Sequence, residues 1–167
     1  TTLAREIAKL TGGDVRSFAG PLRDIVAHID PLVGSEVSWN DAIESLGYTE
    51  AKKQHPLVRQ YLQRTGDAIR RVQPDFFVEA MDDVLCDTDE HIIVDDVRFE
   101  NEYGLLRNYG FLIIKIVRSG GGLDLHESES WPRNFHRSHV RVVNDGDMEG
   151  LKAVAAILAA TTKGRSI

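Results

Sequence analysis

Residues 91–101 constrain the fold more than any other stretch of this 167-residue chain. A β-branched run at 92–94, bounded by polar residues, predicts a short strand buried on both faces, as in a parallel sheet. The run stops on Asp95 and Asp96, and Arg98 follows. Because open α/β sheets bind ligands at the carboxyl ends of their strands, these side chains stand where a site is expected. The structural alternative is that the two aspartates only cap the next helix.

Composition excludes several classes of protein. The hydrophobic content of 42% is enough for one globular domain, and the net charge of −6 argues against non-specific binding to duplex nucleic acid. An anionic ligand must therefore meet a local group of arginines. The chain has neither an apolar run of membrane-spanning length nor a signal-peptide pattern, which predicts a soluble protein without a membrane partner. The single cysteine, Cys86, fits a reducing compartment, and its helical setting predicts a small core residue.

Hydrophobic periodicity and helix-breaking residues predict an alternation of helices and strands. Helices are expected over residues 1–10, 21–29, 39–46, 56–72, 74–85, 99–108 and 148–160. Strands are expected over residues 15–19, 92–94, 111–117 and 140–143. This order predicts an α/β fold with a mostly parallel sheet and right-handed crossovers, in which a helical insertion follows the first strand.

Two further regions carry charged groups that suit an anionic ligand. The helix at 56–72 bears several basic residues, including Arg64 and Arg70, although charges on a helix more often form a solvated face. After the strand ending near Val117, the run Gly120 to Gly122 leads into a charged loop that suits a mobile lid or, equally, an ordinary surface loop. Irregular spacing and the lack of a second cysteine favour exposed loop histidines over a zinc site at His126, His136 and His139.

The segment Val-Asp-Asp-Val-Arg-Phe-Glu-Asn-Glu at 94–102 resembles the deoxynucleoside monophosphate kinases of tailed phages. Weaker matches are Phe-Ala-Gly-Pro-Leu-Arg at 18–23, the Leu-Gln pair at 62–63 with Gly66, Asp67 and Arg70, the His126, Ser128 and Glu129 pattern, and Val-Asn-Asp-Gly at 143–146. Together they extend from residue 1 to about residue 158. The resemblance implies a three-layer P-loop kinase-like fold. It also implies one kinase domain over 1–167, with an NMP-binding insertion of about 20–75 and a lid of about 119–137.

One part of the family pattern is missing from the sequence. Members carry a Gly-rich phosphate loop before the first helix, whereas this sequence contains no Gly-x-x-x-x-Gly-Lys-Ser/Thr. Residues 1–4 resemble those that follow the loop lysine, with Thr1 at the position that contacts Mg²⁺. In the family, the strand before this loop lies between the strands at Ile92 and Phe111. We therefore expect the natural protein to carry this strand and loop ahead of Thr1.

The resemblance implies roles for the residues around phosphoryl transfer. Asp96 would orient Mg²⁺ or its bound water, and Thr1 would be a second metal contact. Asp95 would lie beside the substrate, in a role that the resemblance does not separate from that of Asp96. Arg98 and Arg70 would bind the acceptor monophosphate or the transferring phosphoryl group.

Other residues would recognise the nucleotides. Arg23 is a weaker phosphate candidate because the family often has lysine there, and Gln63 and Arg64 would meet the base or sugar of the acceptor. Phe18 would stack on the base, with a place in the core as the alternative. Arg118 would lie by ATP, and the lid would close over the phosphates with His126, Arg133 and Arg137.

The function implied is ATP-dependent conversion of a deoxynucleoside 5′-monophosphate to its diphosphate, with ATP and Mg²⁺ as cofactors. Its partners would be small nucleotides. The protein would act in the cytoplasm, or in the host cytoplasm if a phage encodes it, and a homodimer is left open. Two other readings also remain open. One is a P-loop kinase of another small phosphorylated or hydroxylated metabolite, and the other is a non-catalytic nucleotide-binding protein.

Overall fold

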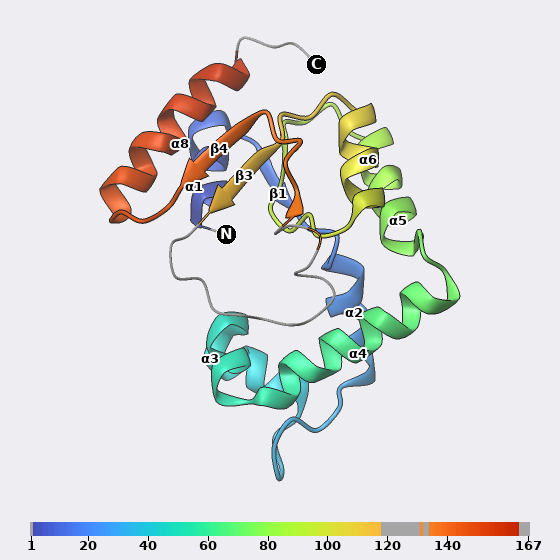
Figure 1. The fold of residues 1–167 in the computed structure, drawn as a ribbon. Helices are drawn as coiled ribbons and strands as arrows, with labels where there is room; N and C mark the ends of the chain where they lie inside the picture. The colour runs from blue at the N-terminus through green and yellow to red at the C-terminus, as the bar shows by residue number, and fades with distance from the viewer. Residues whose placement is uncertain (1, 118–130, 132–133, 164–167) are drawn as a thin grey trace. The chain divides into compact units, whose positions relative to one another are not determined.

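The computed structural model describes residues 2–117, 131 and 134–163, in which helices alternate with short strands (Figure 1). The chain divides into two units. The first comprises Thr1–Ser17 and Asp82–Ile167, and the second comprises Phe18–Met81. The expected insertion of about 20–75 falls inside the second unit, whose regular elements are helices, with one isolated bridge between Leu32 and Ser38 in the loop before α3 (Trp39–Gln54).

The strands of the first unit pair in parallel, as predicted. β1 (Asp14–Arg16) pairs with β2 (Ile92–Val94), and β3 (Ile114–Val117) pairs with β4 (Val140–Val143). The mixed α/β class and the parallel pairing are therefore confirmed. The prediction of a single sheet differs from the structure, in which the described residues form two separate two-stranded sheets, β1-β2 and β3-β4.

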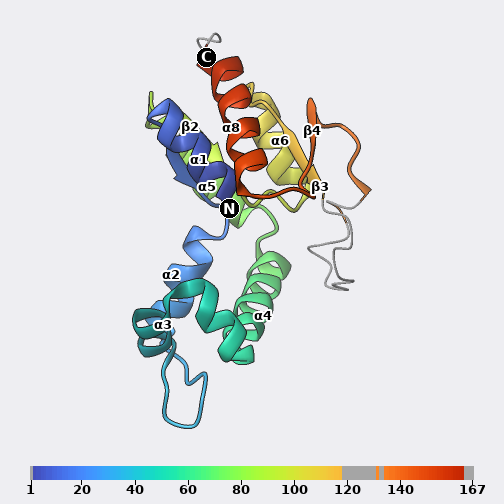
Figure 2. The same ribbon diagram turned by 90° about the vertical axis from the view of Figure 1, so that its left-hand side faces the viewer.

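Two helices of the first unit pack together and supply most of one core. α1 (Thr2–Thr11) lies against α8 (Met148–Lys163), as Figure 2 shows. Their apolar faces meet with β4 in a cluster formed by Leu3, Ile7, Val142, Ala155 and Leu158. Helical spacing of apolar residues thus predicted the buried Leu3, Ile7 and Leu158 correctly, but it also predicts an inward Ile157, which is 67% exposed.

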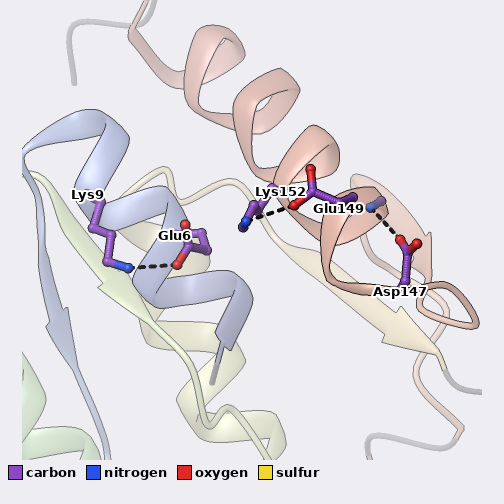
Figure 3. A network of polar contacts seen from close by, with 6 residues as sticks. Glu6, Lys9, Asp147, Glu149 and Lys152 are labelled. Atoms are coloured by element: carbon purple, nitrogen blue, oxygen red, sulfur yellow. Dashed lines mark hydrogen bonds and ion pairs between the residues drawn. The ribbon is translucent and has the colours of Figure 1, made fainter.

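The outer surfaces of α1 and α8 carry local ion pairs (Figure 3). Lys9 Nζ lies 2.8 Å from Glu6 Oε1, and Lys152 Nζ lies 2.9 Å from Glu149 Oε1. The hydrogen bond from Lys9 lowers the pKa of Glu6, and the hydrogen bond to Glu149 raises the pKa of Lys152. Asp147 Oδ1 accepts the Gly150 N–H at 2.9 Å and so caps the start of α8. The ion pairs are exposed and add little to stability.

The second unit contains α2 (Gly20–Ile29), α3 (Trp39–Gln54) and α4 (Pro56–Val72), packed around a core that includes Val26, Trp39, Ala42 and Val58. The predicted helix end at Gly47 is confirmed, because the backbone of Gly47 is not helical, with φ of 72° and ψ of 156°, at a kink between two helical segments of α3. A positive φ favours glycine at this position, and the second helical segment continues to Gln54.

The prediction for Cys86 is wrong, because this residue is exposed at the end of α5 (Phe76–Cys86). Its sulfur lies 2.9 Å from the Tyr109 hydroxyl, which donates to Asp82 Oδ1 at 2.7 Å. The hydrogen bonds with Cys86 and Asp82 raise the pKa of Tyr109. Cys86 thus takes part in a polar surface contact instead of filling the core.

In the first unit, α6 (Glu100–Asn108) connects β2 to β3. Both β1 and β3 are shorter than the predicted strands at 15–19 and 111–117. In the described part of the chain, no helix is both long enough and apolar enough to span a membrane.

A glycine between α1 and β1 makes a sharp test of this packing. A Cβ at Gly13 would press against the His91 carbonyl oxygen and lie 2.7 Å from Ile93 Cδ1. We expect Gly13→Ala to lower the free energy of unfolding by about 1–3 kcal/mol, measured in urea, because backbone must move. Gly104→Ala in α6 is the matched control, since nothing lies within 4 Å of a Cβ there. Equal effects of the two variants would contradict the packing described.

Candidate functional site

The carboxyl edge of the β1-β2 pair brings two polar side chains together. Because the strands run parallel, Ser17 directly after β1 and Asp96 after β2 emerge at the same edge. The Ser17 hydroxyl donates to Asp96 Oδ2 at 2.5 Å, and both residues are half-buried. The predicted Asp96 therefore lies at a strand edge that suits ligand binding. Asp95, also half-buried, lies beside it in the chain.

A buried carboxylate organises the backbone next to this edge. Glu102 is 1% exposed, and its Oε2 accepts the N–H groups of Arg98 at 2.8 Å and Phe99 at 3.2 Å. This arrangement is a capping-box contact at the start of α6, where the N-cap residue is Phe99. The alternative in which Asp95 and Asp96 cap this helix is therefore not what the structure shows.

Arg98 is exposed, but its backbone is held in place. The hydrogen bond from its N–H to Glu102 fixes the chain two residues after Asp96. An arginine and an aspartate that follow the same strand end suit a phosphate group accompanied by a cation. Sequence reasoning missed Glu102, although its place three residues after the N-cap Phe99 was a usable signal. It also missed Ser17, which it had counted inside a longer strand.

The second unit gathers cations around one aromatic ring. The Arg23 guanidinium carbon lies 5.1 Å from the centre of the Tyr48 ring, and Lys52 Nζ lies 4.4 Å from it. Such contacts hold cations in place through the negative face of the ring. The predicted Arg23 is thus positioned by α3, whereas Tyr48 and Lys52 carried no recognisable signal in the sequence.

The candidates on α4 have different surroundings. The Arg70 guanidinium carbon lies 4.5 Å from the centre of the Phe77 ring. Gln63 is half-buried, and Arg64 is exposed on the same helix. Phe18 is 2% exposed, so the proposed stacking on a base has no accessible ring face here. For Phe18, this burial favours the core alternative over stacking on a base.

The expected lid is only partly within the described residues. Arg118, His126 and Arg133 fall outside them, as does Thr1. Arg137, at the end of the predicted lid, contacts α6 through a 2.6 Å ion pair with Glu100. Its guanidinium carbon is also 4.9 Å from the Tyr103 ring centre. This arginine thus has protein partners on the helix that follows β2.

Aromatic packing joins the same segment to α6. The Phe135 ring centre lies 4.9 Å from that of Tyr103 and 4.7 Å from that of Trp131. Lys115 of β3 donates to the Phe135 carbonyl oxygen at 2.6 Å. Phe135 is therefore held against α6 and β3 by both apolar and polar contacts.

The donor atoms at the strand edge suit one kind of metal ion. Oxygen ligands from Asp96 and Ser17 fit Mg²⁺, which usually takes one or two carboxylates and completes its shell with water and substrate phosphates. Among the residues that the structure describes, no three His, Cys, Asp or Glu side chains gather as a ligand group. The edge thus fits a magnesium ion that arrives with a phosphate ligand rather than a closed protein cage.

Comparison with models of protein families, with curated proteins and with solved structures found no match to the chain.

Proposed function

We propose that the protein is a nucleotide kinase that transfers the γ-phosphoryl group of ATP to a deoxynucleoside 5′-monophosphate. The observation that carries this proposal is Asp96, hydrogen-bonded by Ser17 where β1 and β2 end, with Arg98 two residues away. The resemblance of residues 94–102 to the phage kinases adds the acceptor class. The proposal includes the three-layer P-loop kinase-like fold as one domain.

Phosphoryl transfer asks a protein mainly to position groups and to neutralise charge. Bound Mg²⁺ would supply positive charge to the β- and γ-phosphates. Asp96 would hold that ion or its water, and the hydrogen bond from Ser17 fixes the orientation of the carboxylate. Arg98 would clamp phosphate oxygens, because a guanidinium can donate two parallel hydrogen bonds. Glu102 would act as a positioning residue through the Arg98 backbone.

The second unit would bind the acceptor nucleotide. Arg23 and Lys52, both held on the Tyr48 ring, provide positive charge for a monophosphate. Arg70 would add a further phosphate contact, and Gln63 and Arg64 on α4 would meet the base or sugar. With Phe18 buried, base recognition would depend on these α4 side chains instead of on stacking by that ring.

A coupled assay of ADP release tests the function directly. The natural-length protein is mixed with ATP, Mg²⁺ and each deoxynucleoside monophosphate in turn. We expect ADP release in the presence of at least one deoxynucleoside monophosphate and only background release when no acceptor is added. Gln63→Ala should then change the preference among bases, and an unchanged preference would favour a different acceptor class. No release with any monophosphate would contradict the proposed function.

A further inference from the structure

The ring of Tyr48 in α3 gathers two positive charges from different helices of the second unit. Lys52 Nζ, also from α3, lies 4.4 Å from the ring centre, and the guanidinium carbon of Arg23 from α2 lies 5.1 Å from it. The two charges are therefore separated by no more than these two distances together. All three side chains are half-buried.

The local sequence explains why Lys52 lies over this ring. The non-helical backbone of Gly47 separates two helical segments of α3, and Tyr48 directly follows it. Tyr48 and Lys52 are four residues apart, so they share one face of the second segment. A lysine in this position can lay its aliphatic stem along the ring and keep its ammonium group at the surface.

The core of the second unit fixes the ring itself. Tyr48 packs against a buried cluster that includes Trp39, which is 3% exposed. The two ring centres are 6.5 Å apart with an interplanar angle of 62°, an edge contact. Cations that rest on a fixed ring are partly ordered before any ligand arrives, so less side-chain entropy is lost on binding.

The neighbouring lysine has different surroundings. The side chain of Lys53 is 68% exposed, and its Nζ lies 3.1 Å from Glu50 Oε2 on the same helix. Lys52 instead lies close to a second cation, Arg23. Like charges at this separation repel each other, and an anion that contacts both of them removes the repulsion.

The two cations differ in a way that suits a phosphate monoester. Such a group carries a charge of about −1.5 to −2 at pH 7 and three acceptor oxygens. The guanidinium of Arg23 can donate two parallel hydrogen bonds to it, and the ammonium of Lys52 adds a compact point charge. A hydroxyl group has no charge and gains little from the pair. The arrangement therefore favours a phosphorylated acceptor over a hydroxylated one.

We propose that Tyr48 holds Lys52 beside Arg23, and that the two cations together bind the 5′-phosphate of the acceptor nucleotide. Lys52 is a specificity-determining residue, which makes the site select a phosphate monoester and reject the matching nucleoside. Tyr48 is a positioning residue that acts through Lys52. This inference rests on the proposed function, from which it takes the nucleotide. The resemblance to the phage kinases implies a role for neither Lys52 nor Tyr48.

Equilibrium binding without ATP tests the role of Lys52. NMR titrations of the natural-length protein measure Kd for each deoxynucleoside monophosphate and for the matching deoxynucleoside. We expect the monophosphate to bind about 10²-fold more tightly than the nucleoside. Lys52→Gln should reduce this ratio at least about 10-fold and leave the Kd of the nucleoside unchanged. Lys53→Gln is the matched control and should keep the ratio within about twofold, because Lys53 is exposed on a local ion pair.

Two replacements of Tyr48 test the positioning role. Tyr48→Leu removes the aromatic face and should weaken binding of the monophosphate about 3- to 30-fold, whereas Tyr48→Phe keeps that face and should restore binding. In the kinase reaction, we expect Tyr48→Leu to raise KM for the acceptor and to leave KM for ATP nearly unchanged. A purely structural defect would change both KM values. If Tyr48→Leu does not fold, Lys52→Gln decides the inference alone.

The inference and the proposed function can fail separately. If ADP is released but Lys52→Gln keeps the full ratio of monophosphate to nucleoside affinity, the inference is wrong and the kinase stands. If no monophosphate supports ADP release but Lys52→Gln abolishes the preference for the monophosphate, the phosphate site stands and the kinase is wrong. Equal losses of binding in Tyr48→Phe and Tyr48→Leu would overturn the role of the ring.

Discussion

Replacing Asp96 by asparagine in the natural-length protein is expected to lower kcat for ADP release about 10²- to 10³-fold. Asparagine has nearly the same shape and keeps an oxygen that can accept the hydrogen bond from Ser17. It lacks the negative charge that would hold Mg²⁺ or its water. Initial rates at saturating ATP and acceptor measure the effect.

The matched control is Asp14→Asn at the opposite end of the same strand pair. Asp14 starts β1 and forms a 2.7 Å ion pair with Arg16, and both side chains are nearly half exposed. We expect its rate to stay within about twofold of the unmodified protein, because exposed ion pairs contribute little. If the Asp96→Asn protein kept its activity, the proposed role of Asp96 in phosphoryl transfer would be wrong, even though the kinase reaction itself occurs.

Glu102→Ala is expected to reduce the free energy of unfolding by about 2–4 kcal/mol. The change removes the acceptor that the N–H groups of Arg98 and Phe99 share. Glu102 is only 1% exposed, so water cannot readily replace its carboxylate. Urea unfolding followed by circular dichroism measures the loss. The turnover of the folded fraction should fall as well, because the backbone at Arg98 is released.

Glu102→Gln separates the hydrogen bonds from the charge. Its side-chain oxygen can accept the same N–H groups, so we expect a loss of only about 1 kcal/mol and nearly complete recovery of turnover. If glutamine and alanine proved equally harmful, the capping role described for Glu102 would be wrong. If Glu102→Ala caused no loss of stability, the buried hydrogen bonds of Glu102 would contribute nothing to the free energy of unfolding.

Local sequence patterns predicted the helices and strands of this fold well. Most differences between the predicted and the observed fold arise from long-range contacts. The β-branched run at 92–94 had to be a strand, and the apolar spacing in α1, α4 and α8 had to be helical. The division of the strands into two sheets depends on which edges find partners, and no local pattern records that.

The candidate site was predictable only where one segment carries it. Asp96 and Arg98 stand out because they directly follow a strand, but the Ser17 partner of Asp96 is 79 residues away in the chain. Glu102 had a local signal in its capping-box spacing. Helix periodicity alone could not separate Arg70, which lies over Phe77, from the exposed Arg64. It also could not show that Phe18 is buried, because burial depends on packing with distant residues.

The most direct measurement of the central claim follows the phosphoryl group itself. The natural-length protein is incubated with Mg²⁺, ATP labelled at its γ-phosphate and a deoxynucleoside monophosphate, and the products are separated. The account predicts that the label appears on the β-phosphate of the deoxynucleoside diphosphate. Label that stays in ATP with every acceptor, or that is released only as inorganic phosphate, would contradict it.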